Sequence, residues 1–145
     1  MQITHTDIEG VLLIEPKRFG DERGVFTETF RADLLAEAGF DKPFVQDNCA
    51  RSAKRGVVRG LHMQRGPFAQ DKLIRCSRGA IYDVAVDVRK GSPTFGKSVG
   101  YELSALNWRQ LLVPAGFAHG YCTLEDDTEV LYKVCLLYTS DAADE

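Results

Sequence analysis

Short runs of β-branched and aromatic residues, separated by glycine and other turn-forming residues, recur along almost the whole of this chain. The clearest runs are VLLIEP (11–16), GVFTETF (24–30), KLIRC (72–76), AIYDVAVDVR (80–89), SVGYEL (98–103), RQLLVP (109–114) and TEVLYKV (128–134). Such residues favour strands, and the glycines and prolines favour turns between them. Many short strands at short spacing predict an all-β sandwich or barrel of the jelly-roll kind. The mouth of a small barrel is lined by inward-facing side chains, so a ligand is expected there.

One short segment, near residues 31–38, is predicted to be a helix. Its sequence from residue 32, ADLLAEA, consists of good helix formers, and Gly39 supplies a stop.

The run at residues 80–89 shows an approximate period of two, as expected of a strand. Its apolar face is formed by the aliphatic side chains Ile81, Val84, Val86 and Val88. The charged residues of the run are therefore expected away from that face, and these are Asp83, Asp87 and Arg89.

Length and composition fit a single soluble domain, which we place at residues 1–134. The 145 residues are 44% hydrophobic and 27% charged, and no apolar run approaches the ~20 residues of a membrane-spanning helix. The N-terminus, MQITHTDIEG, has no signal-peptide pattern, so we expect a cytoplasmic protein that does not bind a membrane. The chain has no block of lysine and arginine residues, so no nucleic-acid partner is expected. The four cysteines form no C-x-x-C pair, which favours buried thiols over a zinc site or disulfide framework.

The segment 135–145, CLLYTSDAADE, abandons the pattern that precedes it. It looks like the in-frame translation of a sequencing adapter, and we expect it to be a non-native tail; a genuine polar C-terminus is the alternative. Removing its acidic residues, Asp141, Asp144 and Glu145, leaves 18 acidic against 18 basic residues. The acidity of the chain would then come from the tail, and the native protein would continue beyond Val134.

Three histidines are present, and two lie in glycine-rich, strand-like contexts at His62 and His119. A histidine in a β protein is often structural, but two of them near Lys72 and Tyr132 in one barrel would suit proton transfer at neutral pH. Jelly-roll metal sites often use an H-x-H pair, and here Gln64 stands where the second histidine would be. No metal site is therefore expected.

Several basic residues accompany these histidines along the chain: Arg23, Arg51, Arg59, Lys72 and Arg75. Arginine forks match phosphate oxygens, so a cluster at one mouth would suit a diphosphate; each could equally be a surface charge. Phe19 and Phe26 could stack on a nucleobase or pack in the core.

Together these motifs resemble the dTDP-4-dehydrorhamnose 3,5-epimerases, a cupin-fold family that acts on nucleotide sugars. The resemblance spans residues 1–134 and runs through F-x-D-x-R-G-x-F-x-E-x-F (19–30), QDN (46–48), RGLH (59–62), KL (72–73), GAIYDVAVDVR (79–89), GSPTFG (91–96), PAGFAHG (114–120) and YK (132–133). The fold it implies is a cupin-type jelly-roll barrel.

The resemblance also implies roles for individual residues. His62 would remove a proton beside the substrate's C4 ketone, Lys72 would stabilise the enolate, and Tyr132 would return a proton from the opposite face. Positions associated with the sugar or the nucleotide and its diphosphate are Arg23, Phe26, Glu28, Gln46, Asn48, Arg59 and His119. The resemblance implies a dTDP-sugar substrate and a homodimer with strand exchange. It implies no metal or organic cofactor, because the substrate's ketone is itself the electron sink.

One departure from the family concerns the C-terminal portion. The aspartate that pairs with the catalytic histidine in the family belongs to a portion that this chain lacks, so we expect the chain as given to be less stable and less active than a completed one. Alternative functions are a single-site epimerase, a 3,4-ketoisomerase or a non-catalytic sugar-nucleotide-binding cupin. The presence of Tyr132 favours epimerisation at both C3 and C5.

Overall fold

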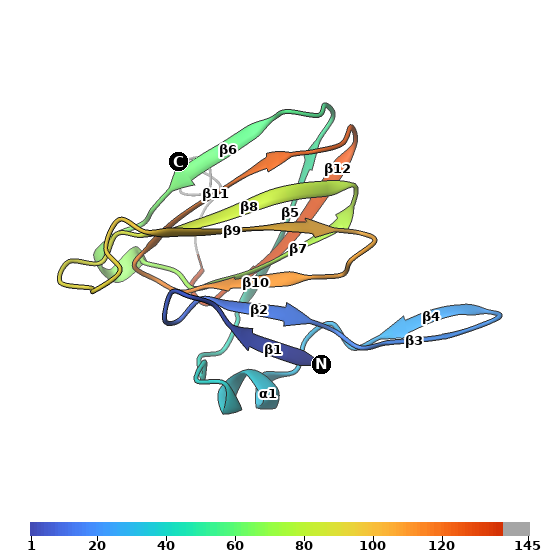
Figure 1. Cartoon of the computed structure of the whole chain (residues 1–145), viewed down its shortest axis with the longest axis horizontal. Coiled ribbons are helices and arrows are strands. Elements are labelled where there is room, and N and C mark those ends of the chain that lie inside the picture. The colour runs from blue at the N-terminus through green and yellow to red at the C-terminus, as the bar shows by residue number, and fades with distance from the viewer. Residues whose placement is uncertain (138–145) are drawn as a thin grey trace.

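The fold consists of two antiparallel sheets that face each other, with a projecting hairpin and one short helix (Figure 1). The computed structural model describes residues 1–137, so most of the predicted tail at 135–145 lies outside the described residues. The larger sheet has the order β1-β2-β10-β7-β12-β5, with strands Gln2–His5, Leu12–Glu15, Gln110–Val113, Lys72–Arg78, Thr128–Val134 and Gln46–Ser52. The smaller sheet has the order β6-β11-β8-β9, with strands Val58–His62, Phe117–Thr123, Ala80–Asp87 and Ser98–Ser104.

The remaining elements lie outside these two sheets. Strands β3 (Arg18–Asp21) and β4 (Gly24–Thr27) form the projecting hairpin, α1 spans Ala32–Glu37, and a single 3₁₀ turn, η1, spans Gly66–Phe68. The predicted all-β class with one short helix is confirmed. Each of the seven runs predicted as strands overlaps an observed strand. No helix within residues 1–137 is long and apolar enough to cross a membrane.

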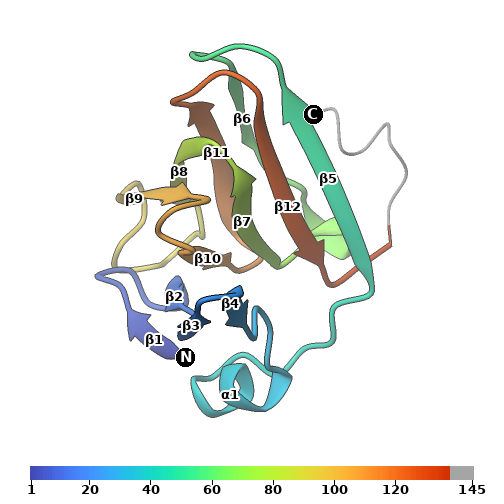
Figure 2. The ribbon, with the colours of Figure 1, turned by 90° about the vertical axis from the view of Figure 1, so that its right-hand side faces the viewer.

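The core has two parts, one on each face of the larger sheet. Between the sheets, apolar side chains from both meet, and they include Ile74, Leu111 and Val130 opposite Ile81 and Phe117. On the outer face, a second cluster joins the larger sheet to the helix through Leu12, Ile14, Leu35, Phe40, Leu73 and Leu112. Figure 2 shows β5 at the edge of the larger sheet, joined to β6 by a loop across the top of the view.

The predicted helix and its stop are confirmed. Gly39 has a φ of +106° and its N–H donates to the carbonyl of Ala36, while the N–H of Phe40 donates to the carbonyl of Leu35. This pair of bonds is a Schellman motif, and glycine provides the left-handed conformation that it requires. Leu35 and Phe40 then pack together in the outer cluster, which anchors the helix end.

The predicted orientation of β8 is wrong. Its inward-facing residues are Ile81, Asp83, Ala85 and Asp87, all buried, whereas Val84 and Val86 are partly exposed on the opposite face. The strand therefore places two aspartates inside the barrel. Buried carboxylates are tolerated where polar partners satisfy them, and both aspartates have such partners.

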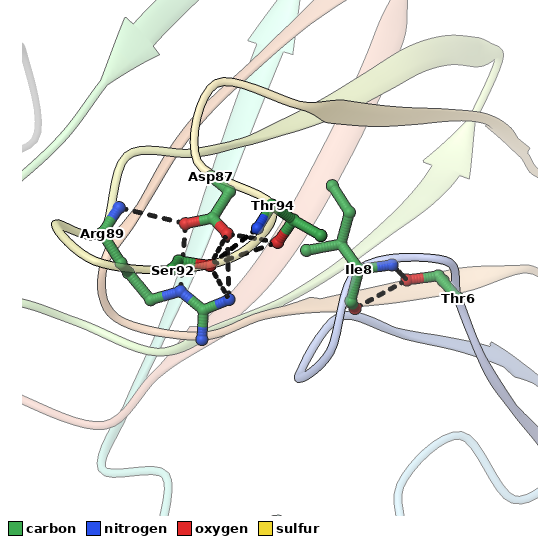
Figure 3. A network of polar contacts seen from close by, with 6 residues as sticks. All are labelled: Thr6, Ile8, Asp87, Arg89, Ser92 and Thr94. Carbon is green, nitrogen blue, oxygen red and sulfur yellow. Dashed lines mark hydrogen bonds and ion pairs between the residues drawn. The ribbon is translucent and has the colours of Figure 1, made fainter.

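Asp87 obtains its partners from the loop that follows β8 (Figure 3). It accepts hydrogen bonds from the Arg89 guanidinium at 3.0 Å and from the hydroxyls of Ser92 and Thr94 at 2.6 Å each. Arg89 also lies over the ring of Phe117, 4.7 Å from its centroid. This network fixes the 88–97 loop against the first residue of β11.

The expectation of buried thiols is correct for Cys76 and wrong for the others. Cys49 is exposed, while Cys122 and Cys135 are intermediate, and all four are free thiols. Cys49 is exposed because it alternates with inward-facing residues on β5.

Candidate active site

The candidate site lies inside the barrel, where two strands of the smaller sheet place their histidines side by side. His62, the last residue of β6, is directly opposite His119 of β11 in the antiparallel register. Directly opposite side chains on paired strands have Cβ atoms about 5 Å apart, so the two imidazoles are neighbours. The sequence prediction that both histidines belong to strands and share one barrel is consistent with this register.

Two glycines allow β6 and β11 to approach at this point. A Cβ on Gly60 would lie 2.7 Å from both the Cα of Gly120 and the carbonyl oxygen of His119. A Cβ on Gly120 would lie 2.9 Å from the carbonyl oxygen of Arg59. The register between the strands shifts between His119 and Tyr121, directly beside this contact. The glycines of RGLH and FAHG thus determine how closely the two histidine-bearing strands pack.

Lys72, at the start of β7 in the facing sheet, shares a cavity with both histidines. His62, Lys72 and His119 line a small hollow of about 10 Å³ together with residues of neighbouring strands and turns. This volume is about that of one water molecule, so the hollow can receive only a small polar group of a ligand. The structure therefore brings two imidazoles and an ammonium group to one cavity.

Burial lowers the pKa of the Lys72 ammonium, and the negative charge of Asp83 partly offsets that effect. A half-buried ammonium is a positive charge incompletely solvated by water, and it interacts strongly with an anion that forms nearby.

Asp83 is a buried neighbour of His119 that sequence reasoning missed. It is fully buried on β8, and its Oδ1 lies 2.6 Å from Nε2 of His119. The wrong orientation predicted for β8 put Asp83 outside the barrel. No single motif reveals this contact, because the carboxylate and the histidine lie on two different antiparallel strands. The signal that was available is the spacing between those two strands.

Tyr132 comes from β12 of the larger sheet and is opposite Asn48 of β5 in the register. Its ring packs partly against the interior core, which contains Tyr121 of β11. Burial raises the pKa of Tyr121 to about 12, so this second tyrosine keeps its proton at neutral pH. Gln46 lies two residues before Asn48 on β5 and donates its side-chain N–H to Asn48 Oδ1 at 2.9 Å.

Arg59 connects the edges of the two sheets. It belongs to β6, and its guanidinium donates to the hydroxyl of Ser52 at 3.3 Å and to the carbonyl oxygen of Arg51 at 3.1 Å on β5. The side chain therefore bridges the edge strands β5 and β6 at the end of β5 that carries Arg51 and Ser52.

Three predicted site residues are not brought to this place. Arg23, Phe26 and Glu28 lie on or just after the projecting β3–β4 hairpin and are exposed. Arg23 is engaged with Asp21 at 2.8 Å, and Glu28 with Arg31 at 3.5 Å. Figure 1 shows the hairpin extending away from the strands that carry the histidines. Within one chain, these residues and the barrel interior form separate surfaces.

A second, larger hollow of about 380 Å³ lies over β5, β7, β10 and β12. Its lining includes Asn48 and Tyr132 as well as Arg75, Gln110 and Lys133. Gln110 is almost fully buried there and donates to the carbonyl oxygen of Thr29 at 2.8 Å. As for metals, residues 1–137 contain no group of three or more histidine, cysteine or acidic side chains able to hold one.

Comparisons with known proteins agree with this architecture. The chain is 55% identical to the dTDP-4-dehydrorhamnose 3,5-epimerase of Shigella flexneri over 140 residues, which cover 96% of this chain and 77% of that protein. Its fold matches the crystal structure of the corresponding Bacillus anthracis enzyme with TDP and PPi bound, at a TM-score of 0.92 and 52% identity, covering 97% of this chain and 81% of the other.

A third similar protein is the dTDP-6-deoxy-D-glucose-3,5-epimerase of Legionella pneumophila in complex with dTDP-4-keto-L-rhamnose. It matches at a TM-score of 0.90 and 46% identity, covering 97% of this chain and 74% of the other. The cupin-type barrel is thus confirmed. The family model described as dTDP-4-dehydrorhamnose 3,5-epimerase matches residues 5–145, and the chain belongs to this epimerase family.

Proposed function

We propose that this protein is an isomerase that epimerises C3 and C5 of dTDP-4-dehydro-6-deoxy-D-glucose to give dTDP-4-dehydro-L-rhamnose. The observation that carries the proposal is the shared cavity of His62, Lys72 and His119, which joins a proton acceptor to a half-buried cation. Proton removal beside a ketone needs both groups, because the base generates an enolate whose oxygen requires a nearby positive charge. The family membership and the TDP-bound relative support the choice of substrate.

In the proposed reaction His62 takes a proton from C3 or C5. The electrons of the broken C–H bond form a C=C bond to C4, and the C4 oxygen becomes an enolate next to Lys72 and His119. Tyr132 then donates its phenolic proton to the same carbon from the opposite face, and the enolate collapses to the ketone. His62 is left protonated and Tyr132 deprotonated, and proton exchange with water restores both. The substrate's ketone is the electron sink, so these steps need no metal or organic cofactor.

The nucleotide part of the substrate is assigned to the polar residues of the edge strands β5 and β6. Arg59 offers a guanidinium matched to diphosphate oxygens, and Gln46 and Asn48 offer amide groups nearer the start of β5. Arg23, Phe26 and Glu28 are assigned to the site of a second copy in a homodimer. Their position on an exposed hairpin, with Phe26 67% exposed and Val25 54% exposed, supports this assignment.

The test is conversion of the keto sugar by purified protein, with the product identified by chromatography against an authentic L-sugar standard. The expected product is dTDP-4-dehydro-L-rhamnose, and the matched control is His62→Asn, which should form none at the same protein concentration. A product inverted at one carbon would replace the double epimerase with a single-site enzyme. Tight nucleotide binding without any product would favour a non-catalytic sugar-nucleotide-binding protein.

A further inference from the structure

The two inward-facing aspartates of β8 differ in how fully they are hydrogen-bonded. Asp87 shares its two oxygens among Arg89, Ser92 and Thr94. Asp83 has one partner, His119, on Oδ1, and its Oδ2 is buried without a hydrogen-bond partner within residues 1–137. A buried carboxylate oxygen without a hydrogen-bond partner lowers the stability of the fold. Its retention is explained if the charge has a role other than stabilising the fold.

Several ionisable groups surround this carboxylate, from all of the strands packed against it. From β7 and β11 they include Lys72, whose pKa the Asp83 charge raises, and Tyr121 beside His119. Within residues 1–137 these groups include Arg59 and His62 on β6, Lys72 and Cys76 on β7, Tyr101 on β9, His119 and Tyr121 on β11 and Tyr132 on β12. The inward-facing residues of β10, Leu111 and Val113, are apolar. Asp83 is therefore a carboxylate set among bases, phenols and cations.

The hydrogen bond to His119 also selects one imidazole nitrogen. A carboxylate can only accept, so Nε2 of His119 must carry the hydrogen that lies between them. With Nε2 committed to Asp83, Nδ1 is the nitrogen left for a ligand in the cavity that His119 lines, where it accepts a hydrogen bond when the ring is neutral and donates one when the ring is protonated. Asp83 thus determines which face of His119 a substrate would meet.

We propose that Asp83 is a positioning residue for the epimerisation: it fixes the ring of His119 through Nε2 and sustains the positive charge of Lys72 where the enolate oxygen forms. The inference rests on the proposed function, since it assigns Asp83 a part in stabilising that enolate. It adds to the site a residue that acts through His119 and Lys72 rather than on the reacting carbons.

Two substitutions separate the two parts of this role. Asp83→Asn removes the charge but keeps a side-chain carbonyl that can still accept from Nε2 of His119. Asp83→Ala removes both the charge and the acceptor. The matched control is Asp87→Asn, which removes the other buried carboxylate of the same strand without touching His119.

The first measurement is the turnover rate against pH in the full-length enzyme. For Asp83→Asn we expect kcat to fall about 10²-fold at neutral pH with KM little changed, as for loss of one oxyanion-stabilising group, because Lys72 loses the carboxylate that supports its positive charge. Because Lys72 would lose its proton at a lower pH without Asp83, the alkaline limb of the profile should move toward neutral pH. Asp87→Asn should lower thermal stability and leave the shape of the profile as in the wild type. A profile of unchanged shape for Asp83→Asn, with kcat near the wild-type value, would overturn the proposal.

The second measurement does not depend on activity. With ¹⁵N-labelled histidine, the NMR spectrum of the wild type should show His119 protonated at Nε2, and Asp83→Asn should preserve that tautomer. Asp83→Ala should change the tautomer or the ring environment of His119. Identical His119 signals in the wild type and Asp83→Ala would contradict the positioning role. If the wild type shows no turnover and Asp83→Ala still alters the His119 signals, the proposed function is rejected. The coupling between Asp83 and His119 is supported in that case.

Discussion

His62 and His119 face each other because their strands pair in a register that the motifs RGLH and FAHG make possible. At this scale the sequence was informative, since residue type and neighbours identified His62, Lys72, His119 and Tyr132 as candidates. Asp83 was not predictable in the same way. An aspartate within an apolar run is ordinarily assigned to the solvent face, and only its pairing with His119 makes the inward orientation favourable.

Replacing His62 by asparagine should abolish proton removal and leave nucleotide binding nearly intact. Asparagine cannot accept a proton at neutral pH, and loss of a general base commonly lowers rates by about 10²–10⁴-fold. Turnover and the dissociation constant for dTDP, measured by calorimetry, would separate the two effects. Comparable turnover in His62→Asn would remove His62 from the role of base.

Replacing Tyr132 by phenylalanine should separate exchange from inversion. The variant keeps the ring that packs against the interior core and loses the phenolic proton. We expect substrate protons to exchange with solvent while formation of the L-sugar falls by about 10²-fold or more. Product formation at the wild-type rate would assign the acid to another residue.

At the scale of elements, the strands with apolar runs were predictable and the polar ones were not. Strand β5, QDNCARS, has no apolar run, yet it pairs along its whole length with β12 and carries Gln46 and Asn48. Its position is determined by that long-range pairing, which local residue preference does not report. The orientation of β8 failed for a related reason at Asp83, because its partner, His119, lies 36 residues away in the sequence.

The contact between β6 and β11 can be tested at Gly120. Gly120→Ala would press a methyl group against the carbonyl oxygen of Arg59 and separate the two histidine-bearing strands. We expect a loss of about 1–3 kcal/mol in the free energy of unfolding, as for overpacking, together with a large loss of turnover. The matched control is Gly20→Ala in β3, where the nearest atom is an ordinary 3.6 Å away. Equal stability of both variants, measured by urea denaturation, would refute the close packing.

The loop network around Asp87 predicts a pH-dependent contribution to stability. Hydrogen bonds from Arg89, then Ser92 and Thr94, hold the pKa of this carboxyl far below its ordinary value of 3.8. A lowered folded-state pKa gives stabilisation that is complete above the unfolded value and is lost as the pH falls toward the folded one. Asp87→Asn should therefore cost about 3 kcal/mol at pH 7, and its difference from wild type should shrink below about pH 4.

The chain contains a matched control for that experiment. Asp21 and Arg23 have the same spacing as Asp87 and Arg89 but lie on the exposed hairpin. An exposed ion pair is screened by water, so Asp21→Asn should leave the urea midpoint almost unchanged at both pH values. If Asp87→Asn lowers the free energy of unfolding by the same amount at both pH values, the network does not depend on the charge of Asp87.

At the scale of the whole molecule, the projecting β3–β4 hairpin exposes apolar side chains that a single chain leaves uncovered. Phe19, Val25 and Phe26 are all more than half exposed. The proposed homodimer would cover them and bring Arg23 and Glu28 to the partner's site. Light scattering should then give about twice the 16.1 kDa mass of the chain.

Val25→Asp should shift this assembly to monomers and weaken substrate binding, because a charge would be placed in the covered apolar surface. The control, Phe95→Asp, changes an exposed apolar side chain in the loop after β8 and should remain dimeric. A monomeric wild type with full activity would rule out the dimeric site.

The most direct test of the central claim is incubation with dTDP-4-dehydro-6-deoxy-D-glucose in heavy water, followed by proton NMR of C3 and C5. Two sequential deprotonations beside one ketone would replace both hydrogens by deuterium. We predict the loss of both signals, accompanied by the appearance of the L-sugar, and neither change with His62→Asn. Retention of both proton signals over many hours with folded wild-type protein would contradict the proposed epimerisation, and loss of one signal would restrict it to that carbon.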